Sequence, residues 1–172
     1  MIVVKGQILN LGGLKILLVD DNRHIRLVMR DILRAVNIRD VFEAGDGAEG
    51  LELLKKIEVD IVITDLSMRP MNGVEFVRAL RLDKENPNPF VPVIMMTGHA
   101  TAKRVAAARD AGVNEFVVKP ITGRNVLDRI RRVIDANSIF VRSRDYFGPD
   151  RRRREDAAET APKRRASDQH LI

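Results

Sequence analysis

The sequence predicts an α/β fold in which a doubly wound, five-stranded parallel sheet carries helices on both faces. Short apolar runs alternate with segments of helical periodicity five times along the 172-residue chain. Such runs, bounded by turn residues, are typical of strands buried in a parallel sheet. Parallel neighbours need long crossover connections, which are usually helices. Five units joined by short loops therefore indicate a (βα)5 arrangement with the sheet between two helical layers.

The first two strand–helix units have clear boundaries. Strands are predicted at 15–19 and 40–44, and Asn22 is a good N-cap for the helix after the first strand. The glycine-rich turn 45–47 opens the second helix. Apolar side chains recur at helical spacing along both helices: Ile25, Met29, Ile32, Leu33 and Val36 in the first, and Ala48, Leu51 and Leu54 in the second.

The third unit has a strand that ends at Asp65 and a loop punctuated by Pro70 and Gly73. The polar, proline-rich segment 83–89 after its helix is expected to be an exposed loop. The residues that place the helix between these loops are Phe76, Val77 and Leu80.

The last two units follow the same pattern. The apolar run 91–96 predicts a strand ending at Thr97, and Thr101 and Gly112 mark the start and end of its helix. The fifth strand ends at Lys119, before Pro120. In the fourth helix, we expect the side chains of Ala102, Val105 and Ala106 to face the core. In the fifth helix, the side chains expected to face the core are Val126, Leu127, Ile130, Val133 and Ile134.

Composition divides the chain into three parts: an N-terminal extension at 1–13, one domain at 14–136, and a tail at 137–172 that is expected to be partly disordered. The formal net charge is +6. Lys and Arg outnumber Asp and Glu by 21 to 18 in residues 1–136 and by 9 to 6 in residues 137–172. Half of the basic excess therefore lies in the short tail.

Composition also excludes several classes of protein. The absence of cysteine excludes a disulfide framework and a thiolate metal site, and it fits a reducing compartment. No apolar run reaches the roughly 18 residues that a membrane helix needs. The apolar N-terminus is interrupted by charged and amide residues and runs into Asp20-Asp21, so we interpret it as an extension rather than a signal peptide. A cytoplasmic location is expected, with no membrane partner.

Polar residues stand where four of the predicted strands end. Asp20 and Asp21 follow the first strand, Asp65 ends the third, Thr97 the fourth and Lys119 the fifth. In an open parallel sheet, ligands bind at the carboxyl ends of the strands. We therefore expect three carboxylates, a hydroxyl and an ammonium to meet at one edge of the sheet.

This set of groups predicts phosphoryl-transfer chemistry. Two carboxylates 4 Å apart repel by ~4 kcal/mol at an effective dielectric of 20, so either a proton or a cation must relieve the cluster. Oxygen ligands in an open, hydrated site suit Mg²⁺. Together with an ammonium and a hydroxyl, the cation stabilises charge on a transferring phosphoryl group, and an exposed carboxylate is a suitable nucleophile.

The same residues resemble the receiver domain of two-component response regulators, a CheY-like, flavodoxin-like fold. The resemblance covers about residues 14–136 and would make this a single-domain regulator with a basic C-terminal tail. Beyond the five site residues, it rests on the segments 44–49 and 111–113 and on Met68, Met71, Gly73 and Phe116.

The resemblance implies a role for each site residue. Asp65 is the expected phosphoacceptor, and Lys119 the phosphate-binding cation, with a cis bond to Pro120. Thr97 and Phe116 are the expected switch pair, in which the hydroxyl moves onto the phosphoryl oxygens and the ring turns inward. Mg²⁺ would be bound by Asp20 through water, and directly by Asp21, Asp65 and the Ser67 backbone carbonyl. The chain would act as an enzyme only on itself, in its own phosphorylation and dephosphorylation.

The sequence departs from the family pattern near the site. The usual proline four residues after the acceptor is Arg69, with Pro70 one place later. Gly50 replaces the usual alanine, which should weaken the second helix by ~0.5–1 kcal/mol. Ser67 and His99 occupy positions that tune dephosphorylation in the family, and Arg69 and His99 are expected to tune this site.

Partners follow from the same resemblance. A histidine kinase or histidine phosphotransfer protein would supply the phosphoryl group. The downstream target is expected to be a protein that binds the face formed by the fourth helix, fifth strand and fifth helix, and phosphorylation is a candidate trigger for homodimer formation. Nucleic-acid binding through the tail is the alternative. A hydrolase or mutase with an aspartate nucleophile is disfavoured because Ser67 stands where its second acid–base aspartate is needed.

The tail contains two kinds of sequence. Phe140, Tyr146 and Phe147 are close together and are expected to anchor the tail on this domain, its dimer or a partner. The segments 151–154 and 163–165 are basic and suit an acidic or phosphate-bearing surface. They lack interleaved aromatic residues, which disfavours a platform for single-stranded nucleic acid.

Overall fold

A five-stranded parallel sheet forms the centre of the computed structural model, which describes residues 2–4, 7–9, 11–98, 101–136, 140–142 and 147–149. The strand order is β4-β3-β5-β6-β7, as a doubly wound sheet requires. The predicted fold class and all five strands are confirmed. The strands are β3 (Lys15–Val19), β4 (Asp40–Ala44), β5 (Ile61–Asp65), β6 (Val93–Thr97) and β7 (Glu115–Val118).

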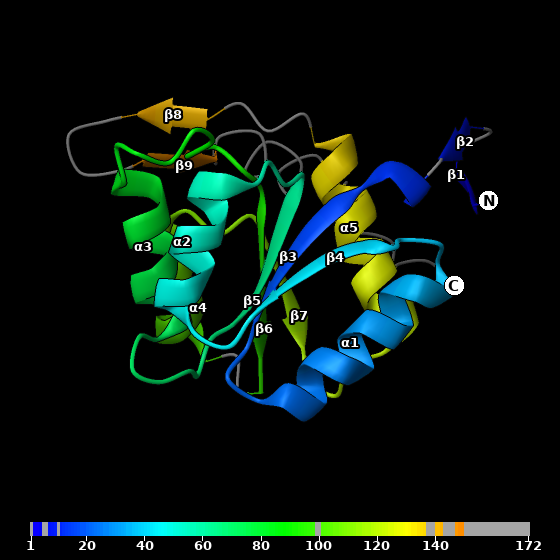
Figure 1. Cartoon of the computed structure of the whole chain (residues 1–172), viewed down its shortest axis with the longest axis horizontal. Helices are drawn as coiled ribbons and strands as arrows, with labels where there is room; N and C mark the ends of the chain where they lie inside the picture. Colours follow the sequence, from blue (N-terminus) through cyan, green and yellow to red (C-terminus); the bar gives the residue numbers. More distant parts are fainter. Residues whose placement is uncertain are drawn as a thin grey trace, which may run out of the picture.

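Five helices cover the two faces of this sheet, as Figure 1 shows. One face carries α1 (Arg23–Ala35) and α5 (Gly123–Asp135), and the other carries α2 (Gly47–Lys56), α3 (Gly73–Leu82) and α4 (Ala102–Ala111). Each helix begins directly after a side chain that accepts a hydrogen bond from the first turn. These N-caps are Asn22, Asp46, Asn72, Thr101 and Thr122.

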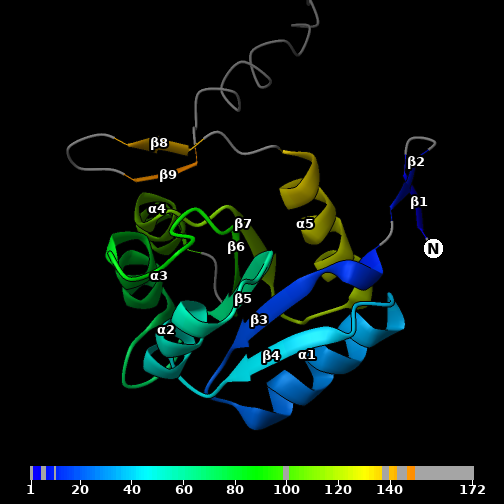
Figure 2. The same cartoon turned by 45° about the horizontal axis from the view of Figure 1, so that its top comes forward.

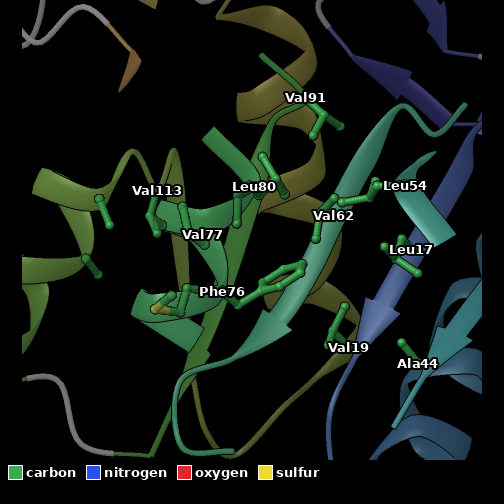
Figure 3. Packing of buried hydrophobic residues seen from close by; sticks show 14 of the residues in the cluster. Leu17, Val19, Ala44, Leu54, Val62, Phe76, Val77, Leu80, Val91 and Val113 are labelled. Carbon is green, nitrogen blue, oxygen red and sulfur yellow. The ribbon is translucent and has the colours of Figure 1, made fainter. Parts of the chain in front are cut away.

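The core consists of one apolar cluster on each face of the sheet. Figure 3 shows the cluster between the sheet and α2, α3 and α4, where the fully buried ring of Phe76 packs among aliphatic side chains. A Cβ on Gly50 would lie 3.1 Å from that ring and 3.2 Å from Val19. The glycine therefore makes room for the large ring beside it. The second cluster includes Met29 and Ile130 and anchors α1 and α5.

The predicted inward face of α4 is wrong in two of its three residues. Ala102 and Ala106 are exposed and Val105 is half-buried, whereas the buried side chains are Ala108 and Ala111. The error has a physical reason, because a helix made largely of alanine has no strong apolar stripe to fix its rotation. Gly112 closes α4 as predicted, at a left-handed φ of 103°.

The loop after α3 is less exposed than its polar composition indicated. Its Asn86 side chain is buried and donates a hydrogen bond to the Leu80 carbonyl, at 3.1 Å. The buried Arg81 guanidinium donates to the carbonyls of Val91, at 2.7 Å, and Gly112, at 2.9 Å. The prediction of an exposed loop is therefore wrong for Asn86.

Two short antiparallel pairs flank the sheet in the sequence. β1 (Ile2–Val4) pairs with β2 (Gln7–Leu9), and a 3-10 turn, η1 (Leu11–Gly13), follows. β8 (Phe140–Arg142) pairs with β9 (Phe147–Pro149), and β9 lies beside α4, as Figure 2 shows. Phe140 and Phe147 thus fall within these strands, whereas Tyr146 and the basic segments of the tail lie outside the described residues. No described helix is long and apolar enough to cross a membrane.

Gly73 permits the close approach of α3 to the end of β5. Its N–H donates to the Leu66 carbonyl at 2.9 Å, and a Cβ at this position would overlap the Asp65 carbonyl oxygen and crowd the Leu66 Cα. We predict that Gly73→Ala lowers the free energy of unfolding by about 1–3 kcal/mol, although alanine is the better helix former. Urea denaturation measures the change.

The matched control for this substitution is Gly13→Ala. A Cβ on Gly13 would have no heavy atom within 4 Å, so its effect should stay within about 0.5 kcal/mol. Equal stability of the Gly73→Ala variant and the unaltered chain would show that the contact with β5 is unimportant.

Candidate functional site

The carboxyl ends of four neighbouring strands form the candidate site. Asp65 ends β5, Thr97 ends β6, and Asp20 and Lys119 follow β3 and β7 directly. Two backbone hydrogen bonds fix these ends against one another: the Lys119 N–H donates to the Thr97 carbonyl at 2.8 Å, and the Leu66 N–H donates to the Met96 carbonyl at 2.9 Å. The structure therefore brings the residues at these strand ends to one edge, as the sheet order requires.

Asp65 is held by a donor on each carboxylate oxygen. The Lys119 ammonium lies 2.8 Å from Oδ1, and the Ser67 N–H donates to Oδ2, also at 2.8 Å. The Asp65 residue is only 5% exposed, so the expectation of an exposed nucleophile is wrong for this carboxylate. Lys119 is half-buried and Ser67 is exposed. Charge-assisted hydrogen bonds of this length stabilise an ionised carboxylate. The same donors are in place to bind negative charge that develops on a group attached to Asp65.

Asp20 is the most buried carboxylate of the set, at 1% exposure. Its Oδ1 accepts a hydrogen bond from the Asn22 N–H at 2.8 Å, but its buried Oδ2 has no hydrogen-bond partner. Burial raises the pKa of Asp20 above its ordinary value of 3.8, the Asn22 N–H opposes that shift, and the Asp65 charge adds to it. An ionised Asp20 therefore needs a positive partner at Oδ2.

Asp21 is exposed and connects two loops of the site. Its Oδ2 accepts a hydrogen bond from the Arg69 N–H at 3.1 Å, which ties the loop after β3 to the loop after β5. The predicted cis bond between Lys119 and Pro120 is confirmed, and the bond between Arg69 and Pro70 is also cis. The unusual Arg69-Pro70 sequence thus contacts the Asp21 carboxylate through its backbone.

The donor set fits a hard divalent cation. Asp20 Oδ2 is a buried acceptor without a partner, and Asp21 and Asp65 supply further carboxylate oxygens at the same edge. Among the described residues, no group of three or more His, Asp or Glu side chains is arranged so that these side chains alone could hold a metal ion. A cation here would complete its shell with water and backbone oxygen, which is how Mg²⁺ is usually held in proteins.

Thr97 and Phe116 lie on adjacent strands near Asp65. Thr97 is 2% exposed and pairs in register with Val118 of β7. Phe116, two residues before Val118, is half-buried and packs against the cluster that contains Phe76. The predicted tuning residue His99 lies outside the described part of the chain.

Sequence reasoning missed an ionic network beneath the carboxylate pair. The Arg26 guanidinium of α1 donates through Nη1 to the Asp20 backbone carbonyl at 2.6 Å and through Nε to Glu43 Oε2 at 3.2 Å. Arg30 Nη1 lies 3.2 Å from the other oxygen of Glu43. The sequence did contain a signal for this network: Glu43 lies inside the predicted strand 40–44, and Arg26 and Arg30 are four residues apart in the preceding helix.

Comparisons with known proteins find a matching family model and similar relatives. Residues 16–131 match the family model described as "Response regulator receiver domain". The chain is 34% identical over 123 residues to chemotaxis protein CheY-3 of Vibrio cholerae, covering 72% of this chain and 93% of that protein. It is 36% identical over 126 residues to the CheY homolog of Campylobacter jejuni, covering 73% and 95%.

Solved structures show the same likeness. CheY4 of Vibrio cholerae matches with a TM-score of 0.65 and 31% identity, over 70% of this chain and 98% of that one. The receiver domain of sensor histidine kinase PA1611 from Pseudomonas aeruginosa PAO1, described with a magnesium ion coordinated in its active-site cleft, matches with a TM-score of 0.63 and 25% identity, over 72% and 98%.

The raised pKa of Asp20 predicts that this carboxylate destabilises the metal-free domain at neutral pH. A carboxyl group whose pKa is higher in the folded state than in the unfolded state lowers the free energy of unfolding when it ionises. The loss of stability grows as pH rises through the folded-state pKa and is complete above that pKa. We predict that Asp20→Asn raises the melting temperature by a few degrees at pH 7 without Mg²⁺, and that the gain shrinks toward pH 4.

Thermal unfolding in EDTA at several pH values measures this gain. The control is Asp31→Asn, an exposed carboxylate on α1, whose substitution should change stability little at any of these pH values. A lower melting temperature for Asp20→Asn at pH 7 would contradict the assigned penalty.

Proposed function

Because the chain belongs to the family of response regulator receiver domains, we propose that it is a two-component switch whose phosphoacceptor is Asp65. The observation that carries this assignment is the state of the Asp65 carboxylate. It is nearly buried, contacts the Lys119 ammonium and the Ser67 N–H, and stands at the edge of the sheet where two further carboxylates follow β3.

The proposed reaction transfers a phosphoryl group to an Asp65 carboxylate oxygen. The new bond joins this oxygen to phosphorus while the bond from phosphorus to a histidine nitrogen of the donor breaks, and that nitrogen leaves with the electron pair. The donor is a histidine kinase or a histidine phosphotransfer protein. Lys119 and the Ser67 N–H stabilise the charge on the transferring oxygens from the positions that they occupy beside Asp65. The chain acts on no separate substrate and catalyses only the gain and loss of its own phosphoryl group.

Four groups are proposed to hold Mg²⁺. The Asp21 and Asp65 carboxylates and the Ser67 backbone carbonyl would bind it directly, and the Asp20 carboxylate would bind it through water. The unpartnered Asp20 Oδ2 is the observation in favour of this site. When bound, the ion neutralises the carboxylates and the phosphoryl oxygens.

Signal output is proposed to start at Thr97 and Phe116. A phosphoryl group on Asp65 attracts the Thr97 hydroxyl, and β7 follows because the Lys119 N–H is bonded to the Thr97 carbonyl. Phe116 then packs further into the core. The helix that follows Thr97 is held by only two buried alanine side chains, so α4 is the element that yields. Arg69 and His99 are proposed to set the lifetime of the phosphoryl group.

The surface formed by α4, β7 and α5 is the proposed docking face for a protein target or for a second phosphorylated copy. Val118 on the edge strand β7 is 49% exposed there. Because β9 lies beside α4, the tail adjoins the same face, and we propose Phe140, Tyr146 and Phe147 as its anchors. Nothing in the comparisons supports the nucleic-acid alternative.

Incubation with acetyl phosphate and Mg²⁺ should add one phosphoryl group to the chain, measured by intact-mass spectrometry. The Asp65→Asn variant and a sample in EDTA should show no gain, because the first lacks the acceptor and the second the cation. Unchanged labelling of Asp65→Asn would refute the assignment of the acceptor.

A second measurement separates the two kinds of output. The phosphorylated chain should not bind duplex DNA at physiological salt, and deletion of residues 148–172 should leave phosphorylation intact. If the tail binds DNA instead, log K should fall against log salt with a slope of about −0.9 per phosphate contact. This DNA binding should disappear when residues 148–172 are deleted.

A further inference from the structure

Arg26 lies beneath the site without contacting Asp65. Its side chain is largely buried, at 16% exposure, between α1 and the neighbouring strands. Nη1 donates to the Asp20 backbone carbonyl at 2.6 Å, and Nε donates to Glu43 Oε2 at 3.2 Å. One planar guanidinium therefore spans two acceptors, one on the segment that follows β3 and one on β4.

The bond to the Asp20 carbonyl acts on both members of the carboxylate pair. The peptide unit that contains this carbonyl is planar and includes the Cα atoms of Asp20 and Asp21. Fixing its oxygen therefore restricts the direction in which each carboxylate leaves the backbone. The same segment is held from other sides, because the Asp20 N–H donates to the Ala44 carbonyl at 3.2 Å and the Arg69 N–H binds Asp21 Oδ2 at 3.1 Å.

Glu43 keeps the guanidinium in place. Its Oε2 accepts from Arg26, and its Oε1 lies 3.2 Å from Arg30 Nη1. The turn after β4 passes beside the guanidinium, since a Cβ on Gly45 would be in ordinary contact with Arg26 Nη1, at 3.8 Å. Lysine keeps the charge but presents a point donor on a flexible stem, so it cannot reproduce the bridge between Asp20 and Glu43.

We propose that Arg26 is a positioning residue that holds the Asp20–Asp21 peptide in the orientation needed for cation binding. The inference rests on the proposed function only for the identity of the cation, Mg²⁺. Arg26 donates to a neutral carbonyl and so leaves the carboxylate oxygens available to the ion. It raises Mg²⁺ affinity by pre-orienting two ligands, in the way that outer groups of metal sites orient the ligands that touch the metal.

Calorimetric titration of the full chain with MgCl₂ tests the proposal. Arg26→Ala and Arg26→Lys are both expected to weaken Mg²⁺ binding by about 10-fold. Arg30→Ala is the matched control, because Arg30 is the other arginine that pairs with Glu43 and it donates no hydrogen bond to Asp20. The Kd of this variant should stay within about twofold of that of the unaltered chain. The Lys variant keeps the charge and much of the stem, so it yields a Kd even if the Ala variant fails to fold.

A kinetic arm separates positioning from direct participation. The rate of phosphorylation by acetyl phosphate in the Arg26 variants should approach that of the unaltered chain at saturating Mg²⁺, because the defect lies in binding the ion. An unchanged Kd in both Arg26 variants, or equal weakening in Arg26 and Arg30 variants, would overturn the proposal. If the unaltered chain binds Mg²⁺ but gains no phosphoryl group, the proposed function fails while the comparison of Kd values still decides the role of Arg26.

Discussion

The ion pair between Asp65 and Lys119, 2.8 Å long, is the interaction on which the rest of the site depends. It joins the ends of β5 and β7 across β6, and it supplies positive charge where carboxylates would otherwise repel one another. The fold brings these groups together because parallel strands end at one edge, and it does so at a cost, since the burial of Asp20 raises its pKa. A site arranged in this way favours any ligand that brings positive charge.

Hydrogen bonds connect the segments around Asp65 in two directions. Toward β7, the Leu66 N–H donates to the Met96 carbonyl of β6, and the Lys119 N–H donates to the Thr97 carbonyl. Toward β3, the Arg69 N–H holds Asp21, and Arg26 holds the peptide before it. The side leading to α4 is packed through alanine and the side leading to α1 through large apolar residues. This difference in packing is the reason why α4 is proposed as the element that moves when Asp65 is phosphorylated.

Much of the fold and site could be predicted from the sequence because local signals and tertiary packing agree there. The apolar runs predicted the strands, and Asn22 and Gly112 predicted two helix ends. The position of each polar residue directly after a strand predicted that these residues meet at one edge of the sheet. The rotation of α4 could not be predicted, since alanine has too little apolar surface to orient a helix. The Arg26–Glu43 bridge was missed because the sequence does not show how deeply each of these side chains is buried. The antiparallel strand pairs near the two ends of the chain were missed because such short strands have no strong hydrophobic periodicity.

Chemical trapping of the phosphorylated residue tests the central claim most directly. After incubation with acetyl phosphate and Mg²⁺, reduction with borohydride converts an aspartyl phosphate to homoserine, and peptide mass spectrometry locates it. We predict homoserine at position 65, with Asp20 and Asp21 unmodified. Homoserine at position 20 or 21, or at none of the three in a chain that gains phosphate, would contradict the assignment of Asp65 as nucleophile and of its neighbours as cation ligands.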